Sequence, residues 1–171
     1  DVGANVGKWS SAAFGYLKGD PKRYVAIEPI PVFAEKARET LSEFQIEVAE
    51  TLLTDDPDCT EMVVHSVGGG GRMYDEIREN KETITYNVQS TTGDQFISRR
   101  KMNLGFIKVD CDGHDLYVLR GFEQTLISHR PLIQFEYSQF WRHSNTKLRD
   151  ALSYFDEKSY SVFQLWPDHL R

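Results

Sequence analysis

The stretch Asp1-Val2-Gly3-Ala4-Asn5-Val6-Gly7 opens the chain and is the starting point for predicting its fold. Gly3 and Gly7 lack the Cβ atom that keeps a ligand away from the backbone, and asparagine is among the few other residues that tolerate left-handed backbone angles. Apolar residues with helical spacing follow at once, at Trp9, Ala12, Ala13, Tyr16 and Leu17. We therefore predict a tight turn from the end of a strand into a helix, with free amide groups that suit a carboxylate or phosphate. The alternative is a strand–helix connection without a ligand.

An acidic residue after the next predicted strand strengthens the ligand interpretation. Residues 24–27 form a short apolar run that ends at Glu28. A carboxylate at the tip of the second strand, roughly 20 residues past a glycine-rich turn, can accept hydrogen bonds from both hydroxyls of a ribose. The opening turn and Glu28 together predict a nucleotide-type ligand. The glycine spacing is not G-x-G-x-x-G, so the dinucleotide fingerprint is not matched.

Strand-like and helix-like segments alternate along the whole chain, which is typical of an α/β fold. We predict strands over 24–27, 45–53, 61–66, 84–92, 104–110, 132–136 and 160–165. We predict helices after the opening turn, after Pro31, and over 95–101, 116–126 and 147–158, the last with Leu148, Leu152 and Phe155 facing inward. The segment Thr92-Gly93-Asp94 is expected to cap the helix at 95–101. The four glycines at 68–71 predict a mobile loop or a disordered linker.

The length of 171 residues, without an internal repeat or a domain boundary, predicts one domain over residues 1–171. The chain starts at the end of what should be the central strand, so we expect the natural protein to continue upstream of Asp1. The chain also stops abruptly over Trp166 to Arg171, so the interpretation of a truncated end extends to the C-terminus.

Composition restricts the classes of function. A net charge of −6 argues against a protein that grips nucleic acid by neutralising phosphates. Cys59 and Cys111 are isolated cysteines, which fits a reducing compartment without a disulfide framework. No apolar run approaches the ~20 residues of a membrane helix, and no signal peptide is visible. We therefore expect a soluble, cytoplasmic protein.

A second polar motif follows the predicted strand at 104–110. The segment Asp110-Cys111-Asp112-Gly113-His114-Asp115 places three carboxylates and a histidine at the carboxyl end of a buried strand, where open α/β sheets carry their chemistry. Flanking carboxylates predict a raised pKa for His114. Either His114 or Asp110 takes part in chemistry, or the histidine is structural.

With these motifs in order, the chain resembles the FkbM-type family of S-adenosylmethionine-dependent methyltransferases. The matching stretches are Asp1–Gly7, Ala26–Pro31, Ile107–Asp115, Leu119–Gly121 and Arg130–Glu136. Asp112 and Asp115 depart from the family pattern, which usually has glutamate at both positions. The resemblance implies a Rossmann-like class I methyltransferase fold, with a mostly parallel central sheet and helices on both faces.

The resemblance also implies the positions of the cofactor, S-adenosylmethionine. Its methionine half would be surrounded by Asp1, Gly3, Asn5 and Gly7. Glu28 would hold the ribose, and Asp110 would lie where the amino end of the cofactor meets the acceptor. In a doubly wound sheet the acidic turn at 54–58 lies beside the cleft, so we also expect Asp55 to meet the adenine amino group, although such turns are commonly only turns.

Members of this family typically methylate oxygen, often on sugars or natural products, so we expect a small hydroxylated acceptor. An alcohol must lose its proton as it attacks the methyl group. His114 is our first candidate for the base, with Asp110 or Asp112 orienting it. Glu136 and His143 are the other candidates. No metal site is predicted, although convergence of Asp110, Asp112 and Glu136 would allow a divalent ion with oxygen ligands.

Two other classes of function remain open. The first is an NAD(P)-dependent oxidoreductase, which would share the glycine-rich turn and the ribose acid. It is weakened by the missing third glycine and by the lack of a Tyr-x-x-x-Lys pair. The second is a non-catalytic binding module that docks a partner through the aromatic loop around Trp141.

Overall fold

The computed structural model of the chain describes residues 1–17, 19–59, 61–65 and 83–165, apart from the side chains of residues 17, 63–65, 83, 84 and 143. The strands are β1 (Val25–Ile27), β2 (Glu47–Ala49), β3 (Leu52–Leu53), β4 (Glu61–His65), β5 (Thr83–Asn87), β6 (Ser90–Thr91), β7 (Phe106–Val109) and β8 (Leu132–Phe135). The α-helices are α1 (Lys8–Leu17), α2 (Pro31–Leu41), α3 (Gly93–Arg100), α4 (Asp115–Gly121), α5 (Glu123–His129) and α6 (Leu148–Glu157). Short 3-10 helices span Pro21–Arg23, Ser42–Phe44 and Gln139–Ser144. The mixed α/β class is confirmed.

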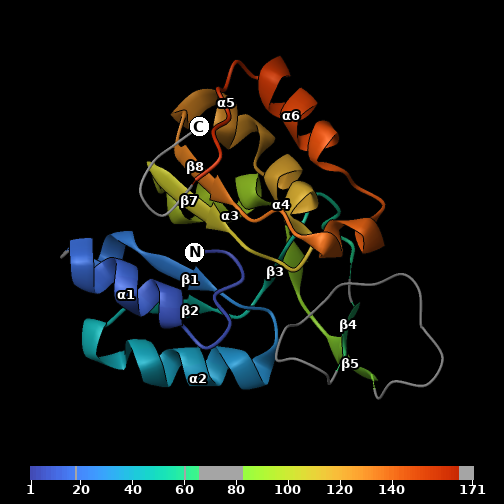
Figure 1. Ribbon diagram of the computed structural model, residues 1–171. Helices are drawn as coiled ribbons and strands as arrows, with labels where there is room; N and C mark the ends of the chain where they lie inside the picture. Colours follow the sequence, from blue (N-terminus) through green and yellow to red (C-terminus); the bar gives the residue numbers. More distant parts are fainter. Residues whose placement is uncertain (18, 60, 66–82, 166–171) are drawn as a thin grey trace.

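The opening residues lie at the centre of a parallel arrangement. β1 pairs with β2 and β7 pairs with β8, both in parallel. Val2 bridges these two pairs through parallel contacts with Ile27 and Val109. Its amide donates to the carbonyl oxygen of Lys108 at 2.9 Å, and its own carbonyl oxygen accepts from Asp110 at 3.1 Å. The order β2-β1-Val2-β7-β8 therefore brings the carboxyl ends of β1 and β7 beside the opening turn, as Figure 1 shows.

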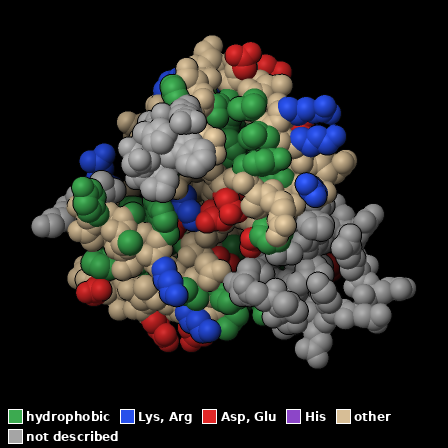
Figure 2. Space-filling model, in the orientation of Figure 1, with side chains coloured by type: hydrophobic (Ala, Val, Ile, Leu, Met, Phe, Trp, Pro, Cys, Tyr) green, Lys and Arg blue, Asp and Glu red, His purple; other side chains and the backbone are tan. Residues whose placement is uncertain are grey.

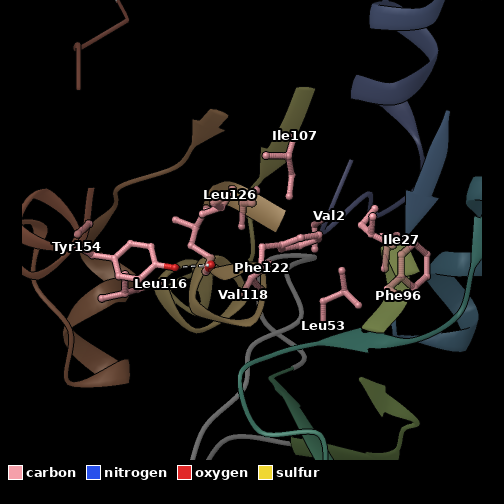
Figure 3. Packing of buried hydrophobic residues seen from close by; sticks show 14 of the residues in the cluster. Val2, Ile27, Leu53, Phe96, Ile107, Leu116, Val118, Phe122, Leu126 and Tyr154 are labelled. Atoms are coloured by element: carbon pink, nitrogen blue, oxygen red, sulfur yellow. Dashed lines mark hydrogen bonds between the residues drawn. The ribbon is translucent and has the colours of Figure 1, made fainter. Parts of the chain in front are cut away.

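Helices cover both faces of this arrangement, as the alternation of side chains along β1 shows. Val25 and Ile27 join a core with residues of α3, α4, α5 and α6, part of which is drawn in Figure 3. Ala26 points to the other face, where it packs with Phe14 of α1 and Leu41 of α2. The two cores together fix the sheet between its helices and hold the strand ends in place.

The predicted strands at 45–53 and 84–92 are each divided in the structure. β2 pairs with β1, whereas β3 pairs in parallel with β6; β4 pairs with β5 in an antiparallel hairpin. Leu52 and Leu53 are both buried, which breaks the alternation of a half-exposed strand. The amide of Leu52 instead donates to the carbonyl oxygen of Gln89 at 2.8 Å. The glycine loop at 68–71 lies outside the described residues.

The predicted helix at 116–126 is two helices, α4 and α5, that meet at Phe122. This residue is 2% exposed, and its ring lies against Gly93 of α3, so closely that a Cβ on Gly93 would collide with it. The tertiary contact explains the break. The predicted strand at 160–165 is also wrong, because residues 161–164 have no regular structure and Leu165 forms only an isolated bridge.

Two helices bury a face different from the predicted one. In α1, Ser10 and Phe14 are buried while Tyr16 is 88% exposed. In α6, Phe155 is 2% exposed as predicted, but Leu152 is 42% exposed and Tyr154 takes the inward position. The hydroxyl of Tyr154 donates to the carbonyl oxygen of Leu119 at 3.0 Å, the dashed line in Figure 3. This polar contact is not visible in an apolar pattern.

Two substitutions on α6 test this orientation. Phe155→Ala removes a fully buried ring, and we expect it to lower the free energy of unfolding by about 3–5 kcal/mol. Leu152→Ala, the matched control, should lower it by less than about 1 kcal/mol, since this side chain is partly solvated. Chemical denaturation of both variants measures the difference. Equal losses would contradict the orientation of the helix.

Candidate active site

The opening turn has the backbone geometry that its sequence predicts. Gly3, Asn5 and Gly7 have φ angles of 77°, 52° and 80°. The reason for glycine differs from the predicted one. A Cβ on Gly3 would collide with the carbonyl oxygen of Asp110, and a Cβ on Gly7 would press on Leu41 of α2 at 3.2 Å. Both glycines therefore permit close packing within the protein.

Glu28 ties the end of β1 to this turn. Its carboxylate accepts hydrogen bonds from the amide of Asn5 at 2.8 Å and from the amide of Ile30 at 3.0 Å. The side chain is 5% exposed, and burial raises its pKa, while the two hydrogen bonds oppose that rise. The turn and the carboxylate are thus in direct contact, as a shared ligand site requires.

A pocket opens beside this contact. Its apolar lining comes from the ends of β1 and β3 and from β4, with Ile27, Ile30, Leu52, Leu53 and Met62. Its polar lining comes from the turn and from the loop after β7, with Gly3, Asn5, Glu28, Asp110, Asp112 and His114. The strand order explains this convergence, because the carboxyl ends of β1 and β7 flank Val2.

Three predicted cofactor residues lie elsewhere among the described residues. Gly7 packs against α2 and does not line the pocket. Asp55 is exposed and lies in a separate surface depression with Arg120 and Lys158, so its position does not support contact with adenine. The side chain of Asp1 is fully buried, where it accepts from the Ser10 hydroxyl at 2.5 Å. It acts within the protein instead of facing the pocket.

Lys108 is a residue of this region that the motif analysis did not single out. Its Nζ atom lies 3.2 Å from Oδ1 of Asp1 and 3.1 Å from Oδ2 of Asp110. The side chain is only 7% exposed and lies 5.4 Å from the centre of the Trp9 ring. One signal was present in the sequence: a lysine inside the otherwise apolar run 106–109 is expected to have a charged partner.

The loop after β7 is shaped by Asp115. Its two carboxylate oxygens accept from the amides of Cys111 at 3.1 Å and Gly113 at 3.0 Å. The residue is fully buried, and burial raises its pKa to about 6. Asp112 and Gly113 have φ angles of 50° and 100°. Asp115 therefore holds a strained loop that carries Asp112 to the pocket.

His114 differs from its prediction. Its pKa is lowered to about 4 by burial and is not raised by neighbouring carboxylates. The ring is 6% exposed and stacks on Tyr117 with 4.9 Å between the ring centres. The oxygens of Asp115 are turned toward backbone amides, which explains why that carboxylate does not hold an imidazolium. Within the described part of the chain, the buried Nε2 atom has no hydrogen-bond partner.

Glu136 follows β8, next to the end of β7. Its amide donates to the carbonyl oxygen of Val109 at 3.0 Å. Burial, then the nearby carboxylates of Asp110, Asp115 and Asp112, and a side-chain hydrogen bond with Asp110 together raise its pKa to about 7. Figure 2 shows acidic side chains gathered in a hollow of this face, between the half with β7 and β8 and the half with β1 and β2. The side chain of His143 is outside the described set.

The described residues contain neither a metal-binding cluster nor a membrane-spanning helix. No group of three or more histidine, cysteine or acidic side chains is arranged to hold a metal ion. None of the described helices has both the length and the apolar composition needed to cross a membrane.

The lowered pKa of His114 predicts a loss of stability in acid. The unfolded chain binds a proton near pH 6.5 and the folded chain only near pH 4, so the stabilisation is complete above 6.5 and is lost as pH falls toward 4. One pKa unit corresponds to about 1.4 kcal/mol, so this loss is roughly 3 kcal/mol. His114→Phe, which cannot titrate, should show a flatter pH dependence of unfolding than the wild type. Parallel curves would contradict burial of a neutral imidazole.

Comparison with known families matches the chain to the methyltransferase FkbM domain over residues 1–162 of 171. Searches of curated proteins and of solved structures gave no significant match. The matched range contains the opening turn, Glu28, the loop after β7 and Glu136. The resemblance seen in the motifs is confirmed, and the chain belongs to the FkbM family of methyltransferases.

Proposed function

We propose that this protein is an S-adenosylmethionine-dependent O-methyltransferase with a class I methyltransferase fold in a single domain over residues 1–171. The observation that carries the proposal is the contact between the opening turn and Glu28, which line one pocket. The parallel order β2-β1-Val2-β7-β8, with helices on both faces, supports the fold assignment.

The pocket residues fit the adenosine part of S-adenosylmethionine. The side chains of Ile30, Leu52 and Met62 offer an apolar surface for a flat base. Glu28 is an acceptor placed for the ribose hydroxyls. The Nε2 atom of His114, which has no hydrogen-bond partner among the described residues, supplies a further hydrogen-bonding group inside the pocket. We assign Glu28 to the ribose and His114 to ligand binding.

We assign the methionine half of the cofactor to the part of the pocket between the opening turn and the loop after β7. Gly3, Asn5 and Asp110 line the pocket there, and the carboxylate of Asp110 is 44% exposed. A carboxylate suits the ammonium group of the ligand. Asp1, which has no exposed side chain, supports this region from behind.

S-adenosylmethionine, when bound, supplies an electrophilic methyl group, and alignment of the acceptor with it accounts for much of the catalysis. Glu136 is our choice for the base that takes the proton of the acceptor hydroxyl. Its pKa of about 7 suits proton transfer at neutral pH, whereas the pKa of about 4 makes His114 a weak base. Asp110 and Asp112 raise the pKa of Glu136 and thereby tune the base.

The acceptor is assigned to a small hydroxylated compound, such as a sugar. A carboxylate base beside the pocket fits an alcohol, whose proton must be removed. Family membership favours methyl transfer over the hydride transfer of an oxidoreductase and over a non-catalytic role. The acidic surroundings also disfavour nucleic acid as a partner.

Binding of S-adenosylhomocysteine tests the cofactor assignment. Calorimetric titration should show binding of this product and none of NADH, and Glu28→Ala should weaken the binding by roughly 1–3 kcal/mol through lost charge-assisted hydrogen bonds. Glu50→Ala is the matched control, because Glu50 is an exposed acid that pairs with Arg38 away from the pocket. Binding of NADH alone, or unchanged affinity in Glu28→Ala, would overturn the assignment.

The pH dependence of kcat/KM tests the base. With an acceptor identified by labelled methyl transfer to hydroxylated compounds, kcat/KM should rise with pH through about 7, because only the deprotonated Glu136 accepts a proton. Glu136→Gln should lower kcat/KM by about 100-fold or more and remove this rise. Its affinity for S-adenosylhomocysteine should change little, since Glu136 does not line the cofactor pocket. An unaltered pH profile in the variant would exclude Glu136.

A further inference from the structure

Lys108 connects two segments that are far apart in the sequence. Its ammonium group is the bridge between Asp1 in the opening turn and Asp110 after β7, at 3.2 and 3.1 Å. The two carboxylates differ in exposure: the side chain of Asp1 is 0% exposed and that of Asp110 is 44% exposed. The bridge therefore runs from the interior to the edge of the pocket.

A buried lysine that bridges two carboxylates indicates a role beyond packing. A lysine in a buried strand is costly unless it is paired, and an apolar residue of similar length would pack there without that cost. Ser10 holds the second oxygen of Asp1 at 2.5 Å, and the ring of Trp9 covers the ammonium group from α1. These contacts fix the ammonium group, and the ammonium group in turn fixes one oxygen of Asp110.

We propose that Lys108 is a positioning residue that holds the carboxylate of Asp110 in place for the methionine half of the cofactor. This inference rests on the proposed function, because it takes Asp110 as the group that meets the ligand ammonium. Lys108 itself does not line the pocket and acts through Asp110. Without the ammonium group, Asp110 would lose its salt bridge, keep its side-chain contact with Glu136, and repel Asp1.

Two ligands separate positioning from general support of the fold. S-adenosylhomocysteine contains adenosine and the methionine-derived chain, whereas 5′-methylthioadenosine lacks the amino acid end. We expect Lys108→Met to raise the Kd of S-adenosylhomocysteine by about 10-fold or more. The Kd of 5′-methylthioadenosine should stay within about 2-fold, because Glu28, the group assigned to the ribose, is held by the amides of Asn5 and Ile30 and takes no part in the Lys108 salt bridges.

Two further variants keep the test decisive if Lys108→Met folds poorly. Lys108→Arg keeps the charge but moves it, so it should fold and show a smaller, still selective loss of S-adenosylhomocysteine affinity. Asp110→Asn should show the same selective loss, and adding Lys108→Met to it should weaken binding little further, since both changes act on one contact.

The outcomes separate the two proposals. Equal weakening of both ligands, no weakening of either, or additive effects of Lys108→Met and Asp110→Asn would overturn the positioning role. Failure of the wild-type protein to bind either adenosine ligand would overturn the proposed function instead.

Discussion

The pairing of Val2 with Ile27 on one side and Val109 on the other is the interaction on which the site depends. Parallel strands in this register end at the same level, so the residues that follow them meet at one edge. Glu28 follows β1 and Asp110 follows β7, and the opening turn lies between them. The turn lies so close to the carbonyl oxygen of Asp110 that a side chain at position 3 would collide with it, so only glycine fits there. The pairing that builds the sheet thus also determines how close Glu28, Asp110 and the opening turn lie to one another.

Features that depend on neighbours in sequence were predictable. The left-handed backbone of Asn5, the strand ending at Glu28 and the cap of α3 by Thr92 each follow from local steric or hydrogen-bonding preferences. The Thr92 side chain accepts from the amide of Gln95, as its position predicts. The family resemblance could likewise be recognised from the sequence, because it was carried by short contiguous motifs.

Features that depend on contacts between distant segments were not predictable. Phe122 interrupts a helical pattern because its ring is held against Gly93. Leu52 does not continue the strand β2, because it belongs to β3 and pairs with β6. The pKa of His114 was predicted in the wrong direction for the same reason. Proximity of carboxylates along the chain suggested a raised value, but burial dominates, and the oxygens of Asp115 are engaged by backbone amides. Sequence distance does not measure either burial or orientation.

The distribution of charge relates these observations to the proposed chemistry. Glu28, Asp110 and Asp112 line the pocket, while the ammonium of Lys108 is turned toward Asp1 and Asp110 behind it. The pocket lining is therefore acidic, and Asp110 and Asp112 add to the effect of burial in raising the pKa of Glu136. In the proposed reaction the donor is a sulfonium cation and the product is a neutral thioether. A negative pocket stabilises the donor more than the product, so the carboxylates that tune the base also favour exchange of the spent ligand.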